Sequence, residues 1–408
     1  MAGRTGHRNE AKTMSEASPK KADTPRRAGS PASRRRLFLK QPAMRRVVYA
    51  LIPVAVSAVY FFGWRVLAVL AVCLAAGLTA EYVMARRRGG PISTACLVTC
   101  WLYALSLPPT VPFWIAAVGI VVAIVFAKEA FGGFGRNFAN PAITGRAFVY
   151  ICFPNDLTSQ FVPAFKGFPG GFAQWSFRAA GELPEYIAGQ VATAGRTVAD
   201  AVSQASPMWV AREYGLDTVV NSGDGATIWD MMLGSIGGVF QAPGQAPRIL
   251  SAGSMGEGCG LLIIAAGVYL LWTKTANWRL MLGCLLGVLV ANTLFRDVLG
   301  YSGLGQVPPV QWQLFAGTTL YVTVFMVTDP VSATKRRPAQ WAYAFLIGFL
   351  VVVLRWQGVF VAAATFSVLL GNMIGPLLDL GAGAWADWRK KRKAPPAAEK
   401  VGPEGKPA

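Results

Sequence analysis

The residues with the clearest potential for chemistry form a short polar run at positions 221–230, Asn-Ser-Gly-Asp-Gly-Ala-Thr-Ile-Trp-Asp. Gly225 and Ala226 carry almost no side chain, so a bulky reagent can approach the hydroxyl of Thr227. The simpler interpretation is a turn that enters a short helix, with Asp224 or Thr227 as its N-cap. Taken alone, this run favours a helix cap over a site of covalent attachment. Evidence from the rest of the chain is needed to choose between these two interpretations.

The composition indicates the class of protein. The chain has 408 residues, of which 53% are hydrophobic and 14% are charged. This is typical of an integral membrane protein, in which each span needs about 20 mainly apolar residues. We therefore predict an all-α membrane protein with about ten spans, at Val47–Phe62, Val66–Met84, Ile92–Leu107, Pro112–Ala127, Ala142–Phe153, Gly256–Trp272, Trp278–Leu294, Trp312–Thr328, Trp341–Leu354 and Val359–Leu378.

The formal net charge of +19 comes in large part from two tails, residues 1–44 and 381–408. Both tails are rich in Pro, Ala and Gly, which predicts disorder. Their basic clusters border apolar segments, so contact with anionic lipid explains them better than nucleic-acid binding does.

Lysine and arginine predict the orientation, because they are enriched in cytoplasmic loops. With the basic N-terminal tail inside, all ten predicted spans agree with one arrangement, and both tails are cytoplasmic. Residues 154–253, which include Thr227, then lie on the outer face as a polar extracytoplasmic insertion. The residues counted at the inner ends are Arg86, Arg87, Arg88, Lys128, Arg136, Arg146, Lys274, Arg279, Lys335, Arg336 and Arg337.

The polar interval divides the membrane region into two halves. Five spans in residues 45–153 precede it, and five spans in residues 254–380 follow it. Because five is odd, the halves enter the membrane from opposite sides, which is the arrangement of an inverted repeat. No residue-level repeat accompanies it, so two inverted five-helix halves remain a hypothesis.

A glycine-rich segment separates the fourth and fifth spans. Gly132, Gly133 and Gly135 cannot sustain a helix, whereas Asn140-Pro141 restarts one with Asn as cap and Pro in the first turn. An ordinary cytoplasmic loop is one interpretation. The other is a re-entrant site for a planar ligand or an ion, because broken backbone at membrane depth needs a protein cavity around it.

The spacing of the cysteine and histidine residues does not match a metal site. Its six cysteines lie in or beside apolar segments without a CxxC pair, and the only histidine, His7, lies in the N-terminal tail. An iron–sulfur centre or haem held by this chain alone is therefore excluded. Any electron transfer would need an organic cofactor.

Six runs of the sequence form specific motifs. They are Lys128-Glu129-x-Phe131-Gly132-Gly133-x-Gly135-Arg136-Asn137-Phe138-x-Asn140-Pro141-Ala142, Thr144-Gly145-Arg146-Ala147-Phe148, Gly253-Ser254-Met255-Gly256-Glu257, Ala276-Asn277-Trp278-Arg279, Thr328-Asp329-Pro330-Val331-Ser332-Ala333 and Gly375-Pro376-Leu377-Leu378-Asp379. These motifs resemble the NqrB subunit of the sodium-translocating NADH:quinone oxidoreductase. The resemblance covers about residues 45–380, and the RnfD subunit of the Rnf complex shares much of it. The run at residues 144–148 looks more like the NADH:quinone reductase branch.

The resemblance implies a covalent FMN on Thr227, joined by a phosphoester bond in a motif that ends in Gly-Ala-Thr. This chain departs from the motif at Asp224, where the family has Ser or Thr, and at Asn221, where it has Asp. The resemblance also implies riboflavin as a second cofactor. Trp229 either lies against the FMN ring or anchors the chain at the membrane surface.

The implied role is an electron relay in a bacterial inner membrane. Electrons arrive from the flavin of a partner subunit, pass through the two flavins and reduce quinone while Na+ is exported. The implied partners are the other subunits of the redox pump, quinone, Na+, the lipid bilayer and the transferase that attaches the flavin, with no nucleic acid.

Acidic residues at span ends are costly in lipid and are therefore candidates for function. Glu129 and Asp329 lie beside chain breaks at the predicted inner side, where they line a sodium path or a quinone pocket in one interpretation. In the other, Glu129 pairs with Lys128 or Arg136. The remaining candidates are Glu81, Glu257, Asp297 and Asp379, with simple interfacial exposure favoured for Glu81 and Asp379.

Two further classes stay open at this point. A channel or carrier would explain inverted halves and the single Asn-Pro-Ala triplet at residues 140–142, although aquaporins use that triplet twice. A non-catalytic scaffold protein would explain the spans but not the Gly-Ala-Thr motif. Bound flavin distinguishes the electron carrier from both.

Overall fold

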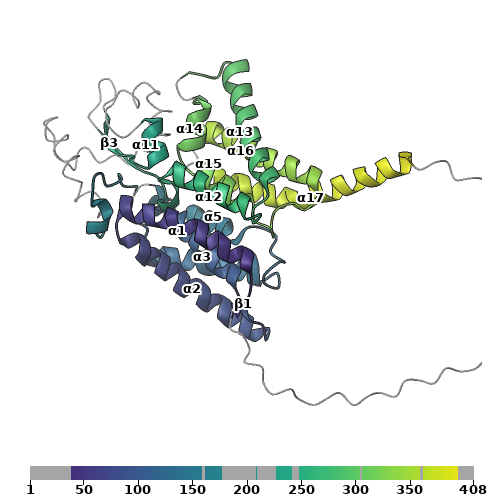
Figure 1. The fold of residues 1–408 in the computed structure, drawn as a ribbon, viewed down its shortest axis with the longest axis horizontal. Helices are drawn as coiled ribbons and strands as arrows, with labels where there is room; N and C mark the ends of the chain where they lie inside the picture. The colour runs from purple at the N-terminus through teal and green to yellow at the C-terminus, as the bar shows by residue number, and fades with distance from the viewer. Residues whose placement is uncertain are drawn as a thin grey trace, which may run out of the picture. The chain divides into compact units, whose positions relative to one another are not determined.

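The computed structural model describes residues 38–158, 161–176, 208, 227–240, 248–303, 306–358 and 362–393. Helices make up most of this part of the chain (Figure 1). Five of them are long and apolar enough to cross a membrane, so the structure agrees with a multi-pass membrane protein but does not establish ten spans. These five are α1 (Pro42–Phe62), α2 (Arg65–Arg87), α13 with its continuation η4 (Trp278–Val298), α16 (Arg337–Gln357) and α17 (Ala363–Lys393).

The other predicted spans are shorter helices, and one of them is broken. α14 ends at Phe315, and the helix restarts only at Thr319. Gly317 lies in the gap with φ of +97°, a left-handed conformation that interrupts a helix. The shorter helices at the other predicted spans are α3 (Thr94–Leu105), α4 (Phe113–Ile124) with its π-helical continuation η1 (Val125–Glu129), α5 (Pro141–Cys152) and α12 (Gly260–Trp272). The broken span consists of α14 (Val310–Phe315), α15 (Thr319–Tyr321) and η5 (Val322–Met326).

The polar interval is described only in part. Its strands β3 and β4 form an antiparallel pair in which Val239 is opposite Ile249. Elsewhere, β1 and β2 form a short parallel pair, so the described residues are not entirely helical. The bounds are α6 (Pro154–Thr158), η2 (Gly170–Ala173), α11 (Ile228–Leu233), β3 (Gly238–Phe240), β4 (Arg248–Leu250), η3 (Met255–Glu257), β1 (Phe38–Leu39) and β2 (Ile92–Ser93).

The two predicted tails differ in how much of them the structure describes. Almost all of residues 1–44 lie outside the described part, apart from β1 and the start of α1. At the other end, α17 continues to Lys393, past the predicted boundary at Leu380. At a rise of about 1.5 Å per residue, its 31 residues are longer than the ~30 Å hydrocarbon core requires, so its basic end extends beyond that core.

The helices of the two halves pair in a similar way. In the first half, α2 contacts α3 and α4, α4 contacts α5, and α1 contacts α3. In the second half, α13 contacts η5 and α16, α16 contacts α17, and α12 contacts α15 and η5. The crossing of α13 and α16 is especially close, because a Cβ added at Gly348 would lie 2.0 Å from the carbonyl oxygen of Cys284. Small residues allow membrane helices to approach in this way.

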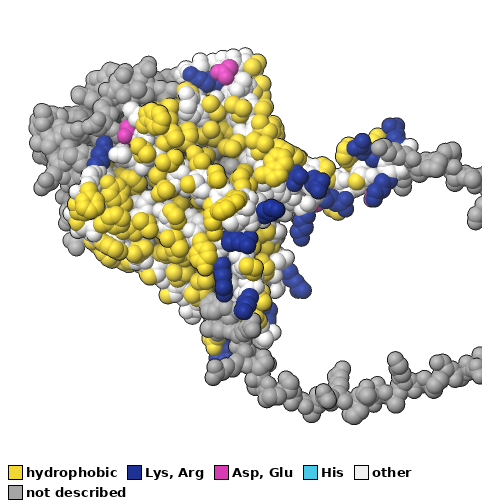
Figure 2. All heavy atoms as spheres, viewed as in Figure 1, with side chains coloured by type: hydrophobic (Ala, Val, Ile, Leu, Met, Phe, Trp, Pro, Cys, Tyr) yellow, Lys and Arg dark blue, Asp and Glu magenta, His cyan; other side chains and the backbone are white. Residues whose placement is uncertain are grey.

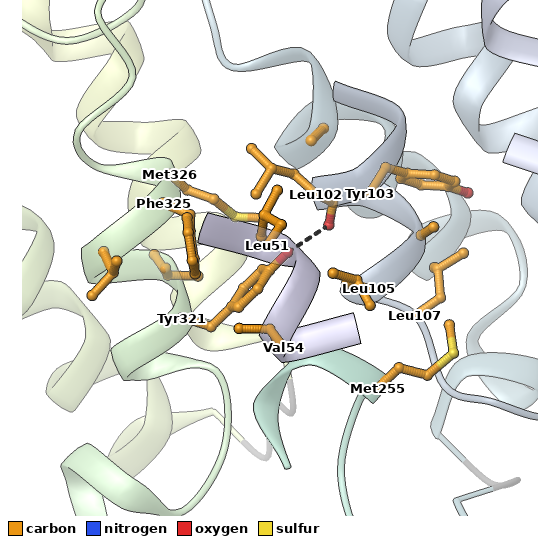
Figure 3. Packing of buried hydrophobic residues seen from close by; sticks show 14 of the residues in the cluster. Leu51, Val54, Leu102, Tyr103, Leu105, Leu107, Met255, Tyr321, Phe325 and Met326 are labelled. Carbon is orange, nitrogen blue, oxygen red and sulfur yellow. Dashed lines mark hydrogen bonds between the residues drawn. The ribbon is translucent and has the colours of Figure 1, made fainter. Parts of the chain in front are cut away.

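One hydrophobic core runs through both halves. Leu51 and Val54 of α1 pack with Leu105 of α3 and with Tyr321 and Phe325 of the second half (Figure 3). The hydroxyl of Tyr321 donates a hydrogen bond to the carbonyl oxygen of Leu102 at 3.2 Å, which ties the halves together (Figure 3).

The surface carries a broad apolar face, and Lys and Arg gather at the side where α17 begins to extend (Figure 2). Two residues counted in the charge argument do not belong to this surface. Lys128 is 2% exposed and Arg146 is 5% exposed, and each has a buried partner. Treating them as positive residues of a cytoplasmic flank was therefore wrong, and the predicted orientation depends on the remaining cations.

Candidate functional site

The glycine-rich segment forms a turn that positions the start of α5. Gly132, Gly133 and Gly135 have φ values of +101°, +89° and +88°, which other residues adopt only with strain. Asn140 then caps α5, because its Oδ1 accepts hydrogen bonds from the N–H groups of Ala142 at 3.0 Å and Ile143 at 3.4 Å. The predicted cap is confirmed, and Pro141 occupies the first turn as expected.

A pocket opens beside this turn, between the two halves of the chain. Its walls come from the starts of α1, α3 and α5, from the turn itself, from the end of α12 and from the segment that follows η5. Most of the lining is apolar, with a few convergent polar groups, which is the usual character of a site for an organic ligand. Those polar groups belong to Thr99, Lys128, Asn137, Asn140, Thr275, Thr328 and Asp329.

Asp329 lies in this pocket, as one of the two interpretations of the sequence expected. It follows η5, at the break before α16. Its carboxylate accepts hydrogen bonds from the hydroxyl of Ser332 at 2.7 Å and from the N–H of Val331 at 3.1 Å. Local bonds therefore orient the carboxylate, while no lysine or arginine forms an ion pair with it among the described residues.

Glu129 does not line the pocket and is not brought together with Asp329. It forms an ion pair with Arg88, whereas the sequence suggested Lys128 or Arg136 as partner. The residue that pairs with Lys128 is Glu81, at 2.5 Å between Nζ and Oε2.

Glu81 was expected to be exposed at the interface, and that expectation is wrong. Its residue is 2% exposed, and its Oε1 accepts hydrogen bonds from the hydroxyl of Ser93 at 2.7 Å and from the N–H of Ser93 at 2.8 Å. Asp379, by contrast, is partly exposed, and it accepts hydrogen bonds from the N–H groups of Lys335 at 3.0 Å and Arg336 at 2.9 Å.

Thr227 is the N-cap of α11, so the simpler interpretation of its sequence run is confirmed for this residue. The N–H of Asp230 donates to Thr227 Oγ1 at 3.2 Å. In return, the carboxylate of Asp230 accepts the hydroxyl of Thr227 at 2.6 Å and its N–H at 3.0 Å. The hydroxyl is half-buried and lies beside a group that can accept its proton.

The structure describes some of the residues near Thr227 but not others. Trp229 is 70% exposed, so its ring is free to contact a ligand or the membrane surface. Gly225 and Ala226, together with Asn221 and Asp224, lie outside the described residues. The predicted open approach to the hydroxyl therefore stays a prediction.

The pocket and Thr227 lie at opposite ends of the same helices. The pocket contacts Ala43 and Val47 at the start of α1, whereas a Cβ added at Gly234, which ends α11, would lie 2.5 Å from Phe61 at the end of α1. Because α1 has 21 residues, its two ends are about 30 Å apart at 1.5 Å per residue.

Within the described part of the chain, no group of three or more His, Cys, Asp or Glu side chains could hold a metal ion. All six cysteines are free there, and five of them are buried.

Comparison with known proteins then decides the family. A model of the NQR2, RnfD, RnfE family matches residues 29–382. The chain belongs to the NQR2, RnfD, RnfE family. The B subunit of the Na(+)-translocating NADH-quinone reductase of Azotobacter vinelandii is 32% identical over 300 residues, which are 73% of this chain and 62% of that protein. The same protein of Pseudoalteromonas atlantica is 33% identical over 301 residues, with the same coverage of 73% and 62%.

The chain thus spans about 62% of the length of the curated relatives that it matches. Membership of the NQR2, RnfD, RnfE family confirms the resemblance noted in the sequence. Because the family model includes RnfD, membership alone does not separate the two kinds of complex.

Sequence reasoning missed three features of this family member. It did not anticipate the Glu81–Lys128 pair, the contribution of Asn137 to the pocket, or the contact of Arg146 with Glu257. The only available signal was charge within apolar segments, which marks Glu81 and Arg146 as costly residues without naming their partners.

Proposed function

We propose that this protein is the flavin-carrying membrane subunit of a Na+-translocating NADH:quinone reductase. It relays electrons from the flavin of a partner subunit, through FMN on Thr227 and through riboflavin, to quinone, and the relay is coupled to ion export. The observation that carries the proposal is the placement of two candidate sites at opposite ends of one helical bundle in a chain of this family. A relay across a membrane requires that arrangement.

The residues around Thr227 fit an attached FMN. A threonine hydroxyl is a weak nucleophile that needs a neighbouring base or a dedicated enzyme, and the Asp230 carboxylate accepts its hydrogen bond at 2.6 Å. Thr227 would hold the phosphate, Gly225 and Ala226 would leave space beside it, and Trp229 would contact the ring. FMN supplies reversible acceptance of one or two electrons, which the side chains of this protein do not provide.

The pocket at the other end fits an uncharged planar molecule such as riboflavin or a quinone head group. Its apolar walls suit an aromatic ring, while Thr99, Asn137 and Asn140 offer polar atoms for orientation. Asp329 and Lys128 lie in the same lining and can move or hold charge there.

We further propose a bacterial inner-membrane location with both tails in the cytoplasm and two inverted five-helix halves. The shared pairing pattern of the halves supports this arrangement. Reporter fusions at residues 40, 200 and 395 are expected to give cytoplasmic, periplasmic and cytoplasmic signals. A cytoplasmic signal at residue 200 would contradict the orientation and remove Thr227 from the side where a periplasmic flavin transferase acts.

The RnfD subunit of an Rnf-type complex is the alternative within the family, and the family model favours neither. A channel or carrier of another class is the remaining alternative. Purified complex separates all three, because the proposed protein supports NADH:quinone reduction, an Rnf-type protein supports ferredoxin-linked NAD reduction, and a channel carries no flavin.

The function is tested by complementation of cells that lack their own copy of this protein. We expect the wild-type chain to restore NADH:quinone reduction and Na+ uptake in inverted vesicles, and Asp329→Asn to lower the coupled rate several-fold because it removes a pocket charge. Glu129→Gln is expected to alter ion coupling, and Asp379→Asn is the control, since Asp379 is a partly exposed acid outside the pocket lining. Normal reduction and normal Na+ uptake in both Asp329→Asn and Glu129→Gln would discard the assigned roles.

A further inference from the structure

A buried polar cluster joins the two halves of the chain. We call it the Arg146 cluster, and it consists of Arg146, Ser254, Glu257, Gln313, Thr318 and Thr319. Arg146 lies at the middle of α5, and its Nη2 donates hydrogen bonds to Ser254 Oγ at 3.1 Å and to Glu257 Oε1 at 3.4 Å. None of the proposed electron-transfer or ion-binding roles above uses this cluster.

Several polar groups of the Arg146 cluster have no hydrogen-bond partner among the described residues. They are Arg146 Nη1, Gln313 Nε2, Thr318 Oγ1 and Thr319 Oγ1. The four residues are 5%, 0%, 2% and 1% exposed, in that order. Native proteins pair almost all buried polar groups, so four unsatisfied groups in one region indicate an acceptor that binds there.

The groups converge at the break in the predicted eighth span. A Cβ added at Gly317 would lie 3.8 Å from Glu257 Oε2, and Thr318 follows Gly317 directly. The same Cβ would lie 3.0 Å from Arg355 Nη2, and Nη1 of Arg355 donates to the carbonyl oxygen of Gln313 at 2.8 Å. A side chain at position 317 would meet the Arg355 guanidinium, so the glycine lets the break in the helix lie directly beside Arg355 and Glu257.

We propose that the Arg146 cluster binds the carbonyl-bearing edge of a flavin ring, and that this ring belongs to the FMN on Thr227. The inference rests on the proposed function. The unpaired groups are one nitrogen of a guanidinium, Arg146 Nη1, with an amide N–H and two hydroxyls, and the carbonyl oxygens and ring nitrogen of a flavin accept hydrogen bonds from all three kinds. A guanidinium at that edge also stabilises the negative charge that the ring gains on reduction.

The position of the cluster supports this assignment. α11, which Thr227 caps, packs against α14 and the start of α12, and these elements carry or adjoin Gln313 and Glu257. A Cβ added at Gly260 would lie 3.2 Å from Phe315 and 3.5 Å from Cα of Met232 in α11. The cluster therefore adjoins the elements on which the flavin-bearing helix rests.

The test is a redox titration of the covalently bound flavin in the purified complex. Arg146→Gln is expected to lower its reduction potential, because the reduced ring loses more stabilisation than the oxidised ring. If the site's preference for the reduced ring over the oxidised ring falls tenfold, the reduction potential falls by 59 mV for a one-electron step. Gln313→Leu removes the unpaired Nε2 together with Oε1, which accepts a hydrogen bond from Arg355 Nη1 at 3.3 Å, and it is expected to give a smaller shift in the same direction. Arg146→Lys is expected to recover part of the loss.

The matched control is Thr334→Val, which removes a buried hydroxyl that is also unpaired but lies beside Gly375, away from the cluster. It is expected to leave the potential unchanged. Covalent flavin in a denaturing gel shows separately whether the proposed function holds, and its absence from the wild-type complex would overturn both claims.

If flavin is attached and its potential is unchanged in Arg146→Gln and Gln313→Leu, the inference is wrong. If those variants instead weaken binding of a quinone analogue with an unchanged flavin potential, the cluster binds quinone and the flavin assignment is overturned.

Discussion

Replacing Thr227 with alanine is expected to remove all covalently attached flavin from the protein. The hydroxyl is the only atom of this side chain that can form a phosphoester, so no adduct survives its loss. Wild-type protein made together with its flavin transferase should stay fluorescent in a denaturing gel, and its Thr227 peptide should gain the mass of FMN less water. Protein made without the transferase should lack the adduct, because a threonine hydroxyl needs assistance.

The alanine variant also loses a helix cap, which costs about 1 kcal/mol at a typical N-cap. Thr227→Asn separates the two effects, because asparagine caps a helix but offers no hydroxyl. We expect Thr227→Asn to be stable and free of flavin, and Thr227→Ser to keep part of the adduct. Covalent flavin in Thr227→Asn would show that another residue carries it.

A wild-type peptide without flavin, from protein made with its native transferase, would refute the assignment. The departures at Asn221 and Asp224 would then be the first cause to test, by Asn221→Asp and Asp224→Ser.

Lys128→Met is expected to be the most destabilising of the substitutions considered for this chain. The side chains of Lys128 and Glu81 are 2% and 3% exposed, and Lys128 Nζ donates hydrogen bonds to Glu81 at 2.5 Å and to Ser93 Oγ at 2.7 Å. Removing the lysine leaves a buried carboxylate without its cation, which typically costs about 3–5 kcal/mol. The measurement is the thermal unfolding midpoint of the purified protein in detergent.

The control for this prediction is the double variant Glu81→Gln with Lys128→Met, in which no buried charge remains unpaired. It is expected to recover most of the lost stability, because replacing both members of a buried pair is often nearly neutral. Equal unfolding midpoints for wild type and Lys128→Met would contradict a structural role for the pair. Arg296→Met, which removes the cation of the solvent-exposed Arg296–Asp297 pair, should cost much less, since solvent screens the charge that remains on Asp297.

The helical membrane class follows from the sequence alone. Segments such as Pro42–Phe62 and Arg65–Arg87 are apolar for the full length of a span, and a backbone in lipid can satisfy its own hydrogen bonds only as a helix or a closed barrel. The cap at Asn140 was predictable for a similar reason, because a residue with a side-chain acceptor before proline satisfies the first N–H groups locally. Local chemistry also sufficed to recognise Thr227 as a possible cap.

Only the tertiary structure decided which charges are buried and which partners they have. Glu81 and Lys128 are 47 positions apart, and Arg146 and Glu257 are 111 apart, so no local pattern joins them. The charge count placed Lys128 and Arg146 at the cytoplasmic ends of their spans. The hydropathy of a segment shows that it can enter a membrane, but it does not show which distant side chain its charged residues contact. The same reason hid the break at Gly317, whose backbone turns beside Glu257 and Arg355, two residues that are distant from it in the sequence. Pairing between distant helices is set by packing, and packing is a property of the folded chain.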